Sequence, residues 1–98
     1  MKDLISGLNK VFESRVRLGI MSVLMVNDSF SFNSLKETLN VTDGNLASHL
    51  KALEDKGLIK ANKQFIGRKP STSYSITGEG INLFKQHLKA LEDLINAQ

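Results

Sequence analysis

The sequence contains no cysteine and no tryptophan, and it has a single proline, Pro70. Without cysteine the chain forms no disulfide, no cysteine-ligated zinc site and no thiol nucleophile. A long apolar run is also missing, because residues 16–26 are interrupted by Arg17, Gly19 and Ser22 and are too few to span a bilayer. No signal peptide is recognisable at the N-terminus. We therefore expect a cytoplasmic protein that makes no membrane contact.

Sequence motifs of enzymes are likewise missing. There is no nucleophile elbow, no glycine-rich phosphate-binding motif and no pair of carboxylates beside a histidine. The two histidines, His49 and His87, have no cluster of metal ligands near them in the sequence. We therefore expect no enzymatic activity, no metal and no cofactor.

Acidic residues are absent from one long stretch of an otherwise mixed chain. The 98 residues carry a net charge of +3, which permits nucleic-acid binding without requiring it. Between Lys56 and Gly78 there is no aspartate or glutamate. The basic residues of this stretch are Lys56, Lys60, Lys63, Arg68 and Lys69. The distribution of charge therefore indicates a basic surface in this part of the chain.

Hydrophobic periodicity predicts helices in the first half of the chain. Apolar residues at helical spacing predict a short helix over residues 2–12, and Ser14 can cap a second helix that ends near Asn27. Residues 30–32 alternate, which predicts a very short strand. The next helix covers residues 34–39, with Ser31 or Asn33 as its cap.

A tight turn at residues 40–41 separates that helix from another. Thr42 can cap this helix, which continues to about Lys56 and is ended by Gly57. Two short helices joined by such a turn are typical of a helix-turn-helix. Its second helix is called the recognition helix below.

After Gly57 the period changes from helical to alternating. Residues 59–65 and 72–77 predict two strands, joined by a turn at residues 67–70. We call this hairpin the wing. Thr77 can cap a last helix from Gly78 to about Ala97. The sequence thus predicts one domain over residues 1–98, mostly α within the α+β class. It is a winged helix-turn-helix (about 32–57) with a two- to three-stranded antiparallel wing sheet (about 58–77) and a long C-terminal helix (about 78–97).

The recognition helix has one apolar face and one small, polar face. Leu46, Leu50 and Leu53 form its buried stripe, and the opposite face suits insertion into the major groove of DNA. The candidate DNA contacts here are Thr42, Asp43, Gly44, Asn45, Ser48, His49 and Lys51. His49 lies at the edge of the stripe. It can therefore either support the packing of the helix or contact a DNA phosphate.

The predicted wing supplies the second candidate surface. Arg68 and Lys69 fall at its tip, and Lys63 and Thr72 fall on its strands. Such a tip can bind phosphates or place an arginine in a minor groove. A merely solvated basic hairpin is the alternative, but the preceding helix-turn-helix favours DNA.

The C-terminal helix carries a second pattern. Ile81, Phe84, Leu88, Leu91 and Ile95 are spaced 3, 4, 3 and 4 residues apart, as in a heptad seam. Packing on the chain's own core is the alternative. We expect a dimer through the distal half of this helix, together with the N-terminal helix. The predicted dimerisation residues are Leu4, Leu8, Phe84, Leu88, Leu91 and Ile95.

Two arginines, Arg15 and Arg17, fall in the first turn of the second helix, where the helix dipole disfavours cations. Either an intramolecular carboxylate or a DNA phosphate would offset this cost. The sequence favours the carboxylate without excluding the phosphate.

The order and spacing of these segments resemble a known family. The matching pieces are RLGIM (17–21), FNSLK (32–36), TDGNLASHL (42–50), LEDKGLI (53–59), KQFIGRKPST (63–72) and ITGEG (76–80). They resemble the MarR/ArsR-like superfamily of winged-helix transcriptional regulators, and most closely its small stand-alone members. The resemblance implies a homodimer on a palindromic double-stranded DNA operator, with residues 42–51 reading bases and Arg68 and Lys69 as the wing contact. A small-molecule effector, if one exists, would use the dimer cleft, because there is no added effector domain.

Together these patterns predict sequence-specific binding of double-stranded DNA by a homodimeric transcriptional regulator. The alternative is a winged-helix protein-interaction module without DNA readout. An acid-free wing favours DNA, since a protein-binding wing is more often apolar or mixed in charge.

Overall fold

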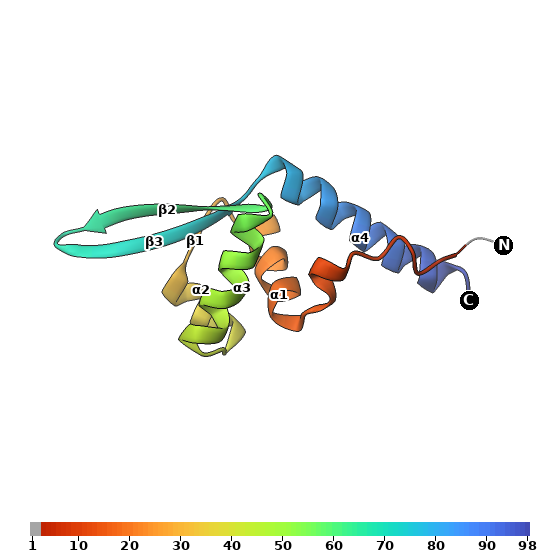
Figure 1. The fold of residues 1–98 in the computed structure, drawn as a ribbon, viewed down its shortest axis with the longest axis horizontal. Helices are drawn as coiled ribbons and strands as arrows, with labels where there is room; N and C mark the ends of the chain where they lie inside the picture. Colours follow the sequence, from red (N-terminus) through yellow and green to blue (C-terminus); the bar gives the residue numbers. More distant parts are fainter. Residues whose placement is uncertain (1–2) are drawn as a thin grey trace.

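A computed structural model describes residues 3–98 of the chain. Its elements in chain order are the 3-10 helix η1 (Lys10–Glu13), α1 (Arg15–Met25), β1 (Phe30–Ser31), α2 (Phe32–Leu39), α3 (Asp43–Asp55), β2 (Ile59–Ile66), β3 (Lys69–Ile76) and α4 (Gly78–Asn96) (Figure 1). The strands form one antiparallel sheet in the order β1-β3-β2. The predicted fold class, a mostly helical winged helix with a long C-terminal helix, is confirmed.

The predicted helix caps are confirmed as hydrogen bonds. Ser14, Thr42 and Thr77 each accept the backbone N–H three residues ahead, at 3.3, 3.2 and 3.0 Å. At α2 the cap is Ser31, which accepts from the backbone N–H of Ser34 at 3.1 Å, and not Asn33. α1 ends at Met25, slightly before the predicted end near Asn27. These local signals therefore fix where α1 to α4 begin.

The hydrophobic core is built around α1, which is apolar on almost every side. Ile20, Met21 and Leu24 of α1 are fully buried, against Leu35 of α2 and the leucine stripe of α3. A helix that is apolar all round is stable only when other elements cover it. The helix-turn-helix is thereby fixed to the rest of the domain through α1.

The wing consists of β2 and β3, which stay paired from Ile59–Ile76 at the base to Ile66–Lys69 at the tip. The turn is only Gly67 and Arg68, so the predicted turn over residues 67–70 is too long, because Lys69 and Pro70 belong to β3. Gly67 has a φ of +66°, as the first central residue of a tight hairpin turn requires. Figure 1 shows the wing projecting well beyond the helices.

The predicted N-terminal helix over residues 2–12 is wrong where the structure describes it, and Lys2 lies outside the described residues. From Asp3 the chain forms turns until η1 begins at Lys10. The backbone N–H of Asn9 donates to Nδ1 of His87 at 3.1 Å, and the Asn9 side chain accepts from the N–H of Val11 at 2.9 Å. Because these bonds hold Asn9 extended as a cap, a continuous helix is interrupted there. The segment instead runs beside the distal half of α4 (Figure 1).

The first half of α4 packs on the chain's own core. Phe84 is only 2% exposed, and its ring meets that of Phe12 edge-on at 5.2 Å between centroids. His87, also buried, lies against the same ring. Phe84 is therefore wrong as a dimerisation residue, since the core of the single chain already covers it. Within residues 3–98, none of the helices is both long and apolar enough to cross a membrane.

Candidate nucleic-acid interface

α3 separates its two faces as its periodicity predicts. Leu46, Leu50 and Leu53 are buried. Six of the predicted contacts are exposed, namely Thr42, Asp43, Gly44, Asn45, Ser48 and Lys51. A Cβ added at Gly44 would meet no atom within 4 Å, so packing within the chain does not require a glycine there. A glycine leaves the backbone open to close approach, so a DNA contact at Gly44 stays a prediction.

Two of the predicted contacts on α3 already pair with charged neighbours. Asp43 forms a 2.8 Å salt bridge with Lys36 of α2, a residue that the sequence analysis missed. Lys51 donates to Asp55 one turn later at 2.9 Å, and this hydrogen bond and the charge of Asp55 raise the pKa of Lys51. Such exposed pairs contribute little stability and exchange readily. Lys51 is thus free to leave Asp55 for a phosphate, whereas Asp43 carries a compensated negative charge.

His49 joins α3 to α1. Its Nδ1 accepts a hydrogen bond from Nε of Arg17 at 3.0 Å. Within residues 3–98, neither Arg15 nor Arg17 has a carboxylate within salt-bridge distance, so the expected carboxylate partner is wrong. The bond gives His49 a structural role, and its contact with a DNA phosphate stays a prediction. Burial and then the charge of Arg17 lower the pKa of His49 from its ordinary 6.5, which keeps the ring neutral at pH 7.

This geometry predicts a specific pH dependence of stability. Below pH 6.5 the unfolded chain binds a proton at residue 49 more readily than the folded chain does, because the folded pKa is the lower one. The contribution of His49 is therefore complete above pH 6.5 and declines as the pH falls toward the lowered folded pKa. Urea unfolding between pH 7.5 and 5 should show the wild type losing more stability than His49→Asn, which keeps an acceptor and cannot titrate. Parallel curves for the two proteins would contradict this role.

A shallow groove lies where α1 begins and where α2 turns into α3. Its volume is about 610 Å³, and its lining includes Arg15, Asn40, Thr42, Asn45 and His49. The N-termini of α1 and α3, whose dipole ends favour anions, both border it. Arg15 of α1 thus lies on the same side of the molecule as the first turn of α3, a juxtaposition that no sequence pattern indicated.

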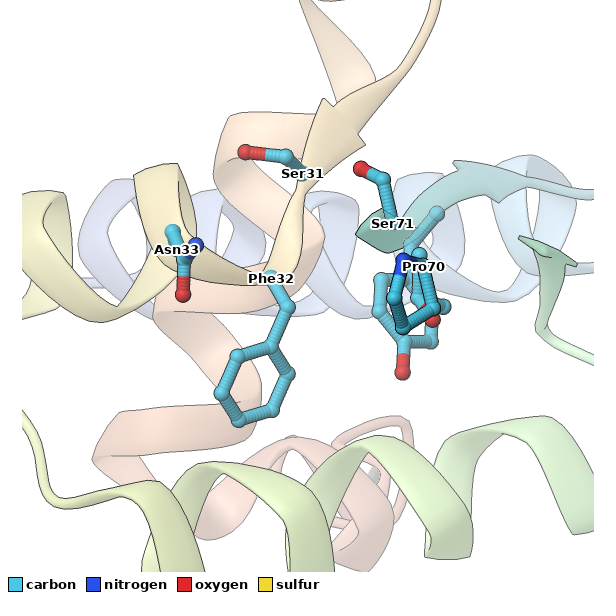
Figure 2. A pocket seen from close by; sticks show the side chains of 7 residues that line it. Ser31, Phe32, Asn33, Pro70 and Ser71 are labelled. Carbon is cyan, nitrogen blue, oxygen red and sulfur yellow. The ribbon is translucent and has the colours of Figure 1, made fainter. Parts of the chain in front are cut away.

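A smaller cavity of about 240 Å³ lies between the start of α2 and the wing (Figure 2). Ser31, Phe32 and Asn33 line one side of it, and Pro70 and Ser71 of β3 line the other. Figure 2 shows the rings of Phe32 and Pro70 pointing toward the side on which α3 lies. The ring of Pro70 therefore lies on the same side of the wing as α3.

The wing carries its predicted contacts in two groups. Arg68 and Lys69 are exposed at the tip, and Lys63 pairs with Thr72 across the two strands. None of the three basic residues has an acidic partner in the described part of the chain. Lys63 also lines a groove together with Lys51 of α3. The structure thus brings the strand residues of the wing and the polar face of α3 to one side of the molecule.

Two exposed apolar residues at the wing tip were not among the predicted site residues. Phe65 and Ile66 are 74% and 65% exposed, although both are large and apolar. Neither residue was given a role from the sequence alone. The hairpin extends past the body of the domain, so no element within residues 3–98 covers either face there (Figure 1).

Comparison with known proteins identifies this architecture. Residues 16–95 match a family described as a winged helix DNA-binding domain. The chain belongs to this family. This winged helix domain is also 42% identical over 79 residues to an uncharacterized protein of Methanocaldococcus jannaschii, a match that covers 81% of the chain and 86% of the relative.

Solved structures share the fold of the winged helix domain. A transcriptional regulator homologue from Pyrococcus horikoshii OT3 superposes with a TM-score of 0.88 and 34% identity, over 99% of this chain and 97% of that one. MepR of S. aureus, solved in complex with DNA, superposes with a TM-score of 0.76 over 94% of this chain and 75% of MepR. At 17% identity, that second likeness shows the fold alone. A MarR-family transcriptional regulator from Silicibacter pomeroyi, at 16% identity, also shares the fold. The family match confirms the winged-helix DNA-binding part of the resemblance seen in the sequence.

Proposed function

We propose that this protein is a sequence-specific transcriptional regulator that binds double-stranded DNA as a homodimer. α3 enters the major groove, and the wing contacts the backbone or the adjacent minor groove. The observation that carries the proposal is the shared surface of the two elements, where the small polar face of α3 and an acid-free basic hairpin lie on one side. An α-helix and a two-stranded ribbon are elements that the grooves of a duplex admit, which supports this proposal.

A second candidate is a protein-interaction module without DNA readout. One observation favours it, namely the exposure of Phe65 and Ile66 at the wing tip. Large exposed apolar side chains often mark contacts with other macromolecules. The basic residues around them favour an anionic partner over a protein of mixed charge.

Base reading is assigned to Asn45 and Ser48. An asparagine amide can pair with the N6 and N7 atoms of adenine, and such a pair discriminates against the wrong base by about 1–3 kcal/mol. Asn45→Ala and Ser48→Ala should therefore change which duplexes the protein selects from a random pool, and weaken binding chiefly to the preferred sequence. Asn82→Ala, on an exposed position of α4, is the matched control and should leave the selected sequence unchanged. An unaltered preference in Asn45→Ala would contradict base reading by this residue.

Dimerisation is assigned to the distal half of α4. Leu88 and Leu91 are exposed there, and Ile95 is 72% exposed. Beside them runs the N-terminal segment, in which Leu4 and Leu8 are half-buried. We infer that these side chains form one apolar strip, which a two-fold partner would cover. Such a dimer would place two recognition helices on half-sites roughly 34–36 Å apart.

The double variant Leu91→Glu/Ile95→Glu should be monomeric in sedimentation equilibrium, because dimer formation would bury its charges. It should also bind a palindromic duplex far more weakly than the wild type, since one half-site no longer assists the other. Val26→Glu is the control, because Val26 is 81% exposed and lies at the C-terminal cap of α1, outside the proposed dimer strip. A wild-type protein that sediments as a monomer at every concentration would refute the dimer.

A further inference from the structure

The wing tip combines exposed apolar side chains with positive charge. Phe65 and Ile66 expose large apolar surfaces, and the neighbouring Arg68 and Lys69 are cations. No acidic residue lies between Gly57 and Gly78. An occupant of this surface must therefore be strongly anionic outside and offer apolar surface within reach. Double-stranded DNA has both, since stacked bases lie beneath its phosphates.

The two apolar residues lie on opposite faces of the hairpin, because side chains alternate along a strand. Ala61 and Lys63 of β2 and Tyr74 of β3 line a groove against α3, so the odd-numbered residues of β2 face the recognition helix. Phe65 continues that face, and Ile66 lies on the other. DNA bound by α3 would meet the face of Phe65.

Phe65 has a specific neighbour on its face. It is paired with Pro70 across the two strands, and paired residues of an antiparallel ladder lie side by side. Figure 2 shows the ring of Pro70 on the side toward α3. Proline has no N–H to donate, so it suits a position in the strand where the ladder needs no hydrogen bond. Its fixed φ also stiffens the strand. Phe65 and Pro70 thus form a small, rigid apolar surface near a basic tip.

We propose that Phe65, supported by Pro70, is a wedge that enters the minor groove next to the segment read by α3 and partly unstacks one base step. Arg68 and Lys69 hold the flanking phosphates. Minor-groove proteins use phenylalanine and proline side chains in this way, and the duplex then kinks toward the major groove. The inference rests on the proposed DNA-binding function and adds a deformation of the DNA to it. The protein would then also prefer flexible base-pair steps that no side chain contacts.

The test compares Phe65→Ser with Ile66→Ser, which removes similar exposed apolar surface from the opposite face of the same tip. The probe is a duplex selected by the wild type, with a dye at each end to report bending and 2-aminopurine at successive steps to report unstacking. The wild type should bend the duplex, and it should increase the 2-aminopurine fluorescence at one base step in each half-site. Phe65→Ser should lose both signals and bind about tenfold more weakly or worse. Ile66→Ser should behave as the wild type.

The outcomes separate this inference from the proposed function. A wild type that binds no duplex would refute both. Duplex binding without bending or unstacking, or equal effects of the two variants, would overturn the wedge and leave DNA binding intact. The wedge is also overturned if Phe65→Ser acts only on self-association in sedimentation, or only on binding to anionic vesicles. Circular dichroism of both variants checks that these exposed substitutions leave the fold intact.

Discussion

Arg68→Ala/Lys69→Ala is expected to weaken binding to every duplex alike and to flatten its salt dependence. Both side chains are exposed at the wing tip without an acidic partner among residues 3–98, so both are available to phosphates. A dimer loses four cations, and each lost phosphate contact makes the slope of log K against log salt shallower by about 0.9. The slope should therefore change by about 3 to 4, with an affinity loss on the order of a thousandfold at 0.1 M salt.

The control removes the same charge elsewhere. Lys10→Ala/Lys85→Ala takes two exposed lysines from η1 and α4, away from the wing and α3. Fluorescence anisotropy titrations of one duplex over a range of salt concentrations measure all three proteins. The control should retain most of the slope. An equal loss in both variants would mean that net charge alone drives binding, and a loss confined to one DNA sequence would mean that the wing reads bases.

Gly80→Ala should be strongly destabilising. Gly80 lies in the first turn of α4, where the wing joins that helix, and a Cβ there would overlap the carbonyl oxygen of Leu58. That oxygen already accepts the N–H of Thr77 at 3.0 Å, and Thr77 in turn accepts the N–H of Gly80. Because the obstacle is bonded backbone, it cannot shift cheaply. We expect a loss of about 3 kcal/mol and a fall in Tm of more than about 10 °C.

Gly78→Ala, two residues earlier in the same turn, is the matched control. A Cβ at Gly78 would meet no atom within 4 Å, so the free energy of unfolding should change by less than about 0.5 kcal/mol. Urea and thermal unfolding at one fixed protein concentration compare the variants, because dimerisation would make Tm depend on concentration. Equal stability of the two variants would contradict the close approach of α4 to the carbonyl group of Leu58, just before β2.

The parts of the fold that sequence reasoning found depend on short-range signals. Ser14, Thr42 and Thr77 mark helix starts because a cap needs only a side-chain oxygen and an N–H three residues ahead. The N-terminal helix failed for the opposite reason. Asn9 is fixed by His87, which lies 78 residues later, and no local pattern reports such a contact. Likewise, the heptad spacing of Phe84 could not show that Phe12 covers it within the same chain.

In the candidate site, too, the features set by local sequence were predicted and those set by contacts between distant residues were not. The polar face of α3 follows directly from helical periodicity, so Gly44, Asn45 and Ser48 were placed correctly on the exposed side. The partners of the charged residues were not predictable, because the bonds from Lys36 to Asp43 and from Arg17 to His49 join different helices. The exposure of Phe65 and Ile66 at the wing tip was not predicted. Alternation along a strand predicts which face a side chain lies on, but not whether another element covers that face.

The salt dependence of DNA binding by the wild-type protein is the most direct test of the whole account. The duplex is first selected from genomic fragments at low salt, and its affinity is then measured as the salt concentration rises. If the dimer makes roughly eight phosphate contacts, log K should fall against log salt with a slope near −7. A slope near zero, or the absence of binding to any genomic fragment at low salt, would contradict DNA binding by α3 and the wing.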